Sequence, residues 1–177
     1  RDGEVRTAPG FRQAYERFAA GGWMGLAFQP DHGGQGLPWT LNTGVAEILA
    51  AADITFQLCP LLTQGTIEAL LRHADTAQQT RWLPPLVAGR WTGAMCLTEP
   101  QAGSDLAAIR STAAPADDPV HGPHHRLRGQ KVFISWGDHD LTSDLVHLVL
   151  ARLPDAPPGS KGISLFLVPK RLADGSR

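Results

Sequence analysis

Apolar residues at helical spacing dominate the first half of the chain. In FRQAYERFAAGG, Phe11, Tyr15 and Phe18 are separated by four and three residues and therefore share one helical face. Gly21 and Gly22 follow and predict the end of this helix. The next stretch, PDHGGQGLP, contains glycines and prolines that interrupt both the helical and the strand period, which predicts a loop.

Three further helices are predicted before residue 90, in WTLNTGVAEILAAAD, TQGTIEALLRHA and AQQTRWLPPL. Asp75 or Thr76 can cap the last of them, because a side-chain oxygen there accepts hydrogen bonds from free backbone N–H groups. The residues expected to face inward are Leu41, Val45, Ile48, Leu49 and Ala52 in the first of these helices, and Ile67, Leu70 and Leu71 in the second.

The pattern changes near Trp91. The apolar run TGAMCL is followed by loop residues, and HRLRGQKVFIS, DLVHLVLAR and KGISLFLVPK have the composition of strands. Between them, APADDPVHGPHH is expected to be a turn or a disordered excursion. The sequence therefore predicts an α+β fold, with a helical domain over residues 1–90 and an antiparallel β-domain over residues 91–177.

Composition and charge argue against several classes of protein. Hydrophobic residues make up 42% and charged residues 19% of the 177 residues, which predicts a folded globular chain. The net charge of -1 and the lack of a basic run give no reason to expect a nucleic-acid partner. No apolar stretch is long enough to cross a bilayer, and no signal peptide is apparent. The chain starts at Arg1 and stops soon after Lys170, so we expect a piece of a longer protein.

The two cysteines and the seven histidines do not predict a disulfide or a metal site. Cys59 and Cys96 form no close pair, which is typical of a reducing compartment and predicts a cytoplasmic protein without disulfides. The histidines at positions 121, 124 and 125 lie in a loop without the spacing of a metal site, so no metal is expected. The stretch HGGQG could be read as a phosphate cradle, but it follows no strand and a surface turn is the simpler interpretation.

The stretch MCLTEPQAGSD is the densest in candidate chemistry. Pro100 biases Glu99 toward extended geometry and forces a turn, which would present the hydroxyls of Thr98 and Ser104. Such groups suit a flat heterocycle rich in carbonyls and ring nitrogens, or a thioester; a capped turn is the alternative. Glu99 and Asp105 invite an acid–base hypothesis, but a carboxylate beside free turn N–H groups is more often structural.

A second stretch, GQKVFISWG, alternates like a strand and places Ser135 and Trp136 at its end. A hydroxyl and an aromatic ring at a strand end could flank a planar ligand. The alternative is a core strand with an exposed tip, and the stretch alone does not decide between the two.

Taken together, these motifs resemble the acyl-CoA dehydrogenase family. The resemblance includes PDHGGQGLP, HADTAQQTRWLPPLVAGRWTGA, MCLTEPQAGSD, GQKVFIS and KGISLFLVP in collinear order from about Phe11 onward. The amino-acid sequence from Phe133 to Lys170 is most similar to the branch of 3-methylmercaptopropionyl-CoA dehydrogenases and related larger members. The resemblance implies a helical N-terminal domain, an antiparallel β-barrel-like middle domain, and a C-terminal helical bundle that this sequence does not show.

The resemblance also implies an FAD cofactor and specific contacts. Thr98 would hydrogen-bond the pyrimidine end of the flavin, and the Ser135 hydroxyl would lie near N5. Ser104 would contact the acyl-CoA, while Glu99 and Asp105 would be structural. The residues expected to contact FAD are Met95, Leu97, Thr98, Phe133, Ile134 and Ser135. Gln101 stands where many relatives have glycine, and Phe133 lacks the indole N–H that many relatives carry at its position.

The implied activity is the dehydrogenation of an acyl-CoA to the 2-enoyl-CoA, with hydride transfer to flavin N5. The substrate would be of the 3-methylmercaptopropionyl-CoA type or a medium- or long-chain acyl-CoA. An electron-transfer flavoprotein would accept the electrons, and the protein would form a homo-oligomer. We find no position that matches the family's catalytic base, so no catalytic residue is assigned. The alternatives are an acyl-CoA oxidase and an alkylation-response, nucleic-acid-binding relative, both without dehydrogenase activity.

Overall fold

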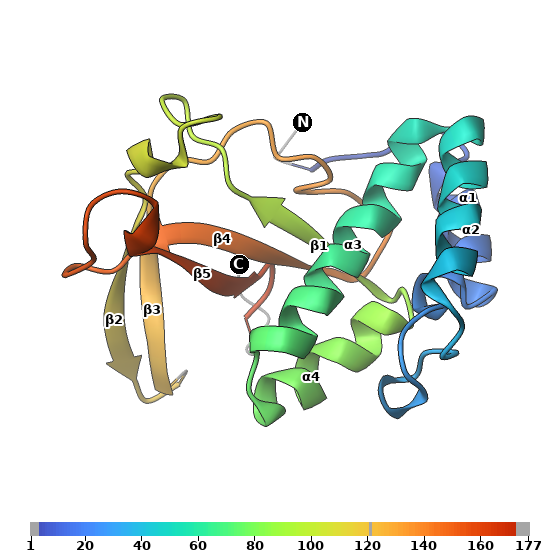
Figure 1. The fold of residues 1–177 in the computed structure, drawn as a ribbon, viewed down its shortest axis with the longest axis horizontal. Helices are drawn as coiled ribbons and strands as arrows, with labels where there is room; N and C mark the ends of the chain where they lie inside the picture. Colours follow the sequence, from blue (N-terminus) through green and yellow to red (C-terminus); the bar gives the residue numbers. More distant parts are fainter. Residues whose placement is uncertain (1–3, 121, 173–177) are drawn as a thin grey trace. The chain divides into compact units, whose positions relative to one another are not determined.

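The computed structural model describes residues 4–120 and 122–172. Contacts divide the chain into two compact units, Arg1–Ala94 with Ser135–Val146, and Met95–Ile134 with His147–Arg177. The α-helices lie in the first unit, and most of the strand residues lie in the second (Figure 1). The helices are α1 (Phe11–Ala20), α2 (Trp39–Ala52), α3 (Ile54–His73) and α4 (Thr76–Val87).

Helix α1 follows the sequence prediction closely. Tyr15 and Phe18 are buried and pack with Met24, Phe56 and other apolar residues into the core of the first unit, with Phe11 at its margin. The helix ends at Gly21, whose N–H donates to Arg17 O over 3.0 Å. The Tyr15 hydroxyl donates to Gly89 O over 2.9 Å, so this buried polar group has a partner.

Helix α2 buries only part of the face that its spacing predicted: Val45 and Leu49 are half-buried, and Leu49 packs against the core of the first unit. Leu41 and Ile48 are 49% and 70% exposed, and Ala52 is also exposed. The buried residue of α2 is Asn42, whose side-chain amide exchanges hydrogen bonds with Gln64 of α3 over 3.2 and 3.0 Å. Helix α2 carries apolar residues around most of its circumference, so its sequence pattern identified only part of the face that packs.

Helices α3 and α4 begin at aspartates. Asp53 caps α3 by accepting hydrogen bonds from the N–H groups of Thr55 and Phe56, so this helix starts nine residues before the stretch that predicted it. Asp75, rather than Thr76, caps α4 and forms a capping box with Gln78. Ile67 and Leu70 of α3 are buried as expected, and Leu71 is half-buried.

Five strands form one sheet in the order β1-β4-β2-β3, with β5 also paired to β4. They are β1 (Trp91–Cys96), β2 (Thr112–Asp118), β3 (Gly122–Arg128), β4 (Asp144–Arg152) and β5 (Ile163–Pro169). The helical part followed by a β-part confirms the predicted fold class. The sheet is mixed, because β2 pairs with β4 in parallel at Thr112 and Arg152, and in the described residues it is not closed into a barrel.

Two predictions for this sheet were wrong. The expected excursion contributes to a β-hairpin, because β2 and β3 pair antiparallel from Thr112 and Arg128 to Asp118 and Gly122 (Figure 1). Pro115 is tolerated because β2 has only β3 as a partner at that position among the described strands. The expected strand over HRLRGQKVFIS ends at Arg128, and residues 129–134 have no regular secondary structure.

Both cysteines are buried free thiols. Burial raises the pKa of Cys59 to about 12 and that of Cys96 to about 11. Cys59 belongs to the first unit and Cys96 to the second. No helix of the described residues combines the length and the apolar character that a membrane span requires.

Candidate functional site

The first motif begins in β1 and leaves the sheet at Leu97. Met95 and Leu97 are half-buried, and Cys96 between them is buried, as the alternation of a strand requires. Thr98 is half-buried, and no residue in the described part of the chain hydrogen-bonds to its side chain. The strand therefore ends with a hydroxyl that could donate to or accept from a polar ligand.

A tight turn follows Thr98. Glu99 and Ala102 exchange two backbone hydrogen bonds of 3.0 Å each, so the chain reverses within four residues. Ser104 and Asp105 lie beyond this turn and are exposed. The Asp105 carboxylate accepts a hydrogen bond from Ala107 N over 3.0 Å and so caps a short 3-10 turn. This contact agrees with the structural interpretation of Asp105.

The Glu99 carboxylate is the electrostatic centre of the motif. It is 4% exposed and accepts hydrogen bonds from Arg110 N over 2.8 Å and from Ser111 N over 3.0 Å. Burial acts to raise the pKa of Glu99, but hydrogen bonds from Ser111, Arg110 and Lys131 outweigh it and lower the pKa to about 2. A carboxylate that stays ionised and occupied by donors is a poor proton acceptor, which favours the structural interpretation of Glu99.

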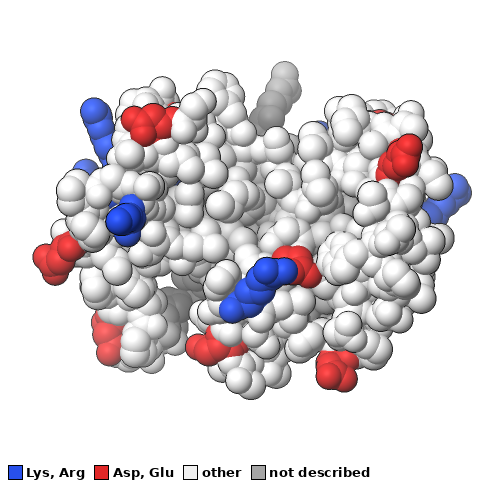
Figure 2. Space-filling view, viewed as in Figure 1, with Lys and Arg blue, Asp and Glu red and all other residues white. Residues whose placement is uncertain are grey.

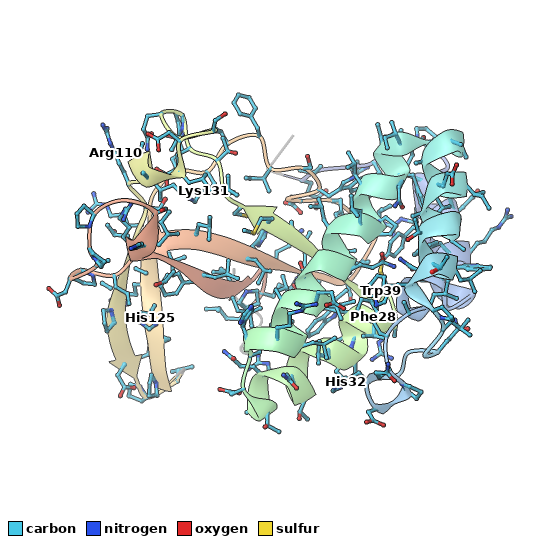
Figure 3. The ribbon with its side chains drawn as sticks, viewed as in Figure 1. Phe28, His32, Trp39, Arg110, His125 and Lys131 are labelled. Atoms are coloured by element: carbon cyan, nitrogen blue, oxygen red, sulfur yellow. The ribbon has the colours of Figure 1, made fainter. Side chains whose placement is uncertain are left out.

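Lys131 joins the first motif to the second. Its ammonium donates to Glu99 Oε1 over 2.9 Å and to Leu97 O over 3.1 Å, and its side chain is 12% exposed. The next residue, Val132, donates its N–H to Thr98 O over 3.0 Å. Figure 3 shows Lys131 and Arg110 near each other in the second unit, consistent with their shared contact with Glu99. The two motifs, about thirty residues apart in the sequence, therefore lie side by side.

Phe133 has an unusual backbone conformation. Its φ is 58°, in the left-handed region that non-glycine residues rarely adopt, and its side chain is 91% exposed. A bulky residue held in this conformation with its ring in solvent costs stability and makes no compensating contact within the described chain. Ile134 is half-buried, and Ser135 directly follows it as an exposed residue that belongs to the first unit.

The structure thus brings Leu97 and Thr98 next to the segment that carries Phe133 and Ile134. Sequence reasoning missed Lys131, since a lysine in an alternating stretch is normally assigned to the solvent face. It also missed Arg152, which donates to Ala107 O over 2.7 Å, to Ile109 O over 2.9 Å and to Pro157 O over 3.3 Å. Backbone carbonyls are acceptors at every residue, so no sequence signal could have indicated these partners.

Two other motifs have structural explanations. The backbone N–H groups of residues 33–36 all donate to carbonyls of residues 25–30, over 2.8–3.1 Å, so HGGQG has none left to hold a phosphate. No group of three potential metal ligands occurs in residues 4–120 and 122–172. His121 lies outside the described residues, His124 pairs with Asp118 at 3.7 Å, and His125 lies 5.2 Å from the Phe166 ring.

Comparison with known protein families identifies the class. Residues 2–90 match the acyl-CoA dehydrogenase N-terminal domain, and residues 94–177 match the acyl-CoA dehydrogenase middle domain. The chain belongs to the acyl-CoA dehydrogenase family. It is 49% identical to 3-methylmercaptopropionyl-CoA dehydrogenase of Ruegeria pomeroyi over 172 residues, which cover 97% of this chain and 29% of that protein. It is 36% identical to a butyryl-CoA dehydrogenase of Syntrophomonas wolfei over 94% of this chain and 27% of that protein.

Solved structures agree with this assignment. The butyryl-CoA dehydrogenase of Megasphaera elsdenii superposes with a TM-score of 0.77 at 27% identity, covering 89% of this chain and 40% of that one. An acyl-CoA dehydrogenase of Bacillus anthracis complexed with FAD superposes with a TM-score of 0.74 at 25% identity, covering 92% of this chain and 26% of that one. The chain therefore spans less than a third of the length of the two curated relatives described above.

Proposed function

We propose that this chain forms part of an FAD-dependent acyl-CoA dehydrogenase, which converts an acyl-CoA thioester to the 2-enoyl-CoA. The observation that carries this proposal is the junction of the two motifs at Thr98 and Val132, braced by Lys131 on Glu99. It is supported by the family membership and by the FAD complex of the Bacillus anthracis relative.

Residues of the two motifs have the chemistry that the edge of a flavin requires. Thr98 has a hydroxyl without a partner among the described residues, Ser135 is exposed, and Phe133 presents an aromatic ring to solvent. A flat heterocycle with polar edges would pair with the hydroxyls and cover the apolar groups. We propose that FAD contacts Met95, Leu97, Thr98, Phe133, Ile134 and Ser135. When bound, FAD would supply the two-electron oxidation by accepting a hydride at N5.

The chain's own contribution would be binding, orientation and hydrogen-bond donation. The Lys131 ammonium is neutralised by Glu99, so we assign hydrogen bonding to the ring edge to the Thr98 and Ser135 hydroxyls and neighbouring backbone N–H groups. We propose that Ser104 contacts the acyl-CoA, because it is exposed on the loop that follows Thr98. No residue of this chain is assigned as the base that removes the α-proton.

Substrate and partners follow from the relatives. The 49% identity to the Ruegeria pomeroyi enzyme favours a 3-methylmercaptopropionyl-CoA-type substrate, with medium- or long-chain acyl-CoA as the alternative. We propose an electron-transfer flavoprotein as electron acceptor, a homo-oligomeric protein, a cytoplasmic location, and a domain boundary between residues 90 and 91.

Two alternative functions within the acyl-CoA dehydrogenase family differ from this proposal in their activity. An acyl-CoA oxidase would pass electrons to oxygen, and an alkylation-response relative would bind nucleic acid. The second alternative is less favoured, because Figure 2 shows charges of both signs dispersed over the visible face rather than a basic patch.

The test uses the protein expressed at the full length of its gene. We expect a yellow protein whose visible flavin absorption bleaches when acyl-CoA is added without oxygen, with 3-methylmercaptopropionyl-CoA, butyryl-CoA and a long-chain acyl-CoA compared. Slow reoxidation in air and fast reoxidation by an electron-transfer flavoprotein would distinguish a dehydrogenase from an oxidase. A folded protein that takes up no FAD would contradict the proposal.

A further inference from the structure

Gln101 spans the loop that carries Ser104. Its side-chain Nε2 donates to Glu99 Oε2 over 2.6 Å and to Ala108 O over 3.2 Å. Both hydrogens of the amide nitrogen are therefore used, one at the start of the loop and one near its end. The Gln101 side chain therefore bridges the two ends of the loop formed by residues 102–107.

The base of this loop is fixed by other groups as well. The Glu99 carboxylate accepts hydrogen bonds from the N–H groups of Arg110 and Ser111. The Arg152 guanidinium donates hydrogen bonds to the carbonyls of Ala107 and Ile109. The tip of the loop is open by contrast. A Cβ at Gly103 would meet nothing within 4 Å, and Ser104 and Asp105 are exposed. The shape of the tip therefore depends on how the segment leaving Ala102 is held, which is where Gln101 acts.

Gln101 is suited to positioning the loop. The residue itself is exposed, but the Glu99 carboxylate that it contacts is buried, so this hydrogen bond ties the start of the loop to a fixed group. A small displacement of a ligand-contacting side chain has a large effect on binding and catalysis. The two hydrogen bonds of Gln101 therefore bear on the placement of Ser104, which lies three residues further along the chain.

We propose that Gln101 is a positioning residue for the CoA thioester, holding the loop so that Ser104 reaches the bound substrate. This inference rests on the proposed function. It assigns Gln101 to substrate binding, because its side chain spans the loop that carries Ser104.

The experiment compares three variants of the full-length holoenzyme. Gln101→Leu keeps the volume and removes the donors, Gln101→Lys restores donors to both acceptors, and Gln13→Leu changes an exposed glutamine on α1 as a matched control. The quantities measured are KM and kcat with the best acyl-CoA of the panel, the Kd for FAD, and the flavin absorption spectrum.

We expect Gln101→Leu to raise KM about tenfold, as the loss of roughly one positioned contact would do. Its FAD affinity and absorption spectrum should match the wild type, Gln101→Lys should recover most of the KM, and Gln13→Leu should resemble the wild type. An unchanged KM in Gln101→Leu, or a weakened FAD affinity in that variant, would overturn the inference while leaving the proposed function intact. A wild-type protein that binds FAD but is not reduced by any acyl-CoA would instead contradict the proposed function.

Discussion

The Lys131 ammonium and the Glu99 carboxylate form an ion pair of 2.9 Å, with their side chains only 12% and 3% exposed. Lys131 precedes Phe133 by two residues, and Glu99 directly follows Thr98. The pair therefore sets the spacing between the two segments that we assign to the flavin. A buried ion pair is sensitive to the removal of one partner, because the remaining charge stays desolvated.

Replacing Lys131 with methionine should destabilise the protein. Glu99 would keep its backbone donors but lose its counter-charge, so we expect the free energy of unfolding to fall by about 3 kcal/mol. Urea denaturation measures this change, and the exposed residue Lys161 provides the matched control as Lys161→Met. Equal stability of the two variants would show that the pair is not energetically significant.

Acid should destabilise the protein through Glu99. Its pKa in the folded state is about 2, below the ordinary value of 4.5, so the ionised form stabilises the fold at neutral pH. This contribution, about 3 kcal/mol, is fully present above pH 5 and is lost as the pH falls toward 2. Glu99→Gln should flatten the pH dependence of stability over this range. If the variant and the wild type keep parallel pH profiles, Glu99 is not the group responsible.

Gly129 should not tolerate a larger side chain. An added Cβ would lie 2.1 Å from Ser111 Oγ and 2.7 Å from Ser111 Cβ, so the segment leading to Lys131 would have to move. We expect Gly129→Ala to lower stability by about 2 kcal/mol and to weaken FAD binding. Gly44→Ala is the control, because nothing lies within 4 Å of the added atom and alanine favours the interior of helix α2. A Gly129→Ala protein as stable as Gly44→Ala would contradict the predicted collision.

Two substitutions at Phe133 separate strain from function. Glycine removes the cost of the left-handed backbone, whereas alanine keeps it, and both remove the ring. We therefore expect Phe133→Gly to be more stable than Phe133→Ala by about 1 kcal/mol in thermal unfolding of the protein without FAD.

The same pair tests the role of the aromatic ring. If the exposed ring contacts the flavin, both variants should bind FAD more weakly than the wild type and to a similar degree. Wild-type affinity in either variant would remove Phe133 from the proposed site, and equal stability of the two would mean that the backbone conformation carries no strain.

The sequence predicted the helices and motifs that depend on local signals. The face of α1, the cap at Asp75 and the strands β4 and β5 follow from periodicity and from side chains that bond their own backbone. The same approach succeeded only in part for helix α2, because Leu49 packs against the core while Leu41 and Ile48, which have the spacing of the same face, remain exposed. Apolar spacing indicates a surface that can be buried, while the neighbouring elements decide whether it is.

The candidate site shows the same limit. Thr98, Ser104 and Ser135 could be proposed from the motifs, but the groups that hold the two segments together could not. Lys131 reaches Leu97 and Glu99 across a gap of more than thirty residues, and Gly129 is required by its distance from Ser111. Residues 129–134 alternate like a strand, yet their contacts with residues 97–99 replace regular pairing.

The two buried thiols offer a built-in reporter of local opening. A thiol reacts with an alkylating reagent as the thiolate, so Cys59 and Cys96 should be protected until their surroundings open to water. Because one lies in each unit, mass-spectrometric labelling rates at the two positions would record the opening of the helical unit and of the strand-rich unit separately in a single experiment.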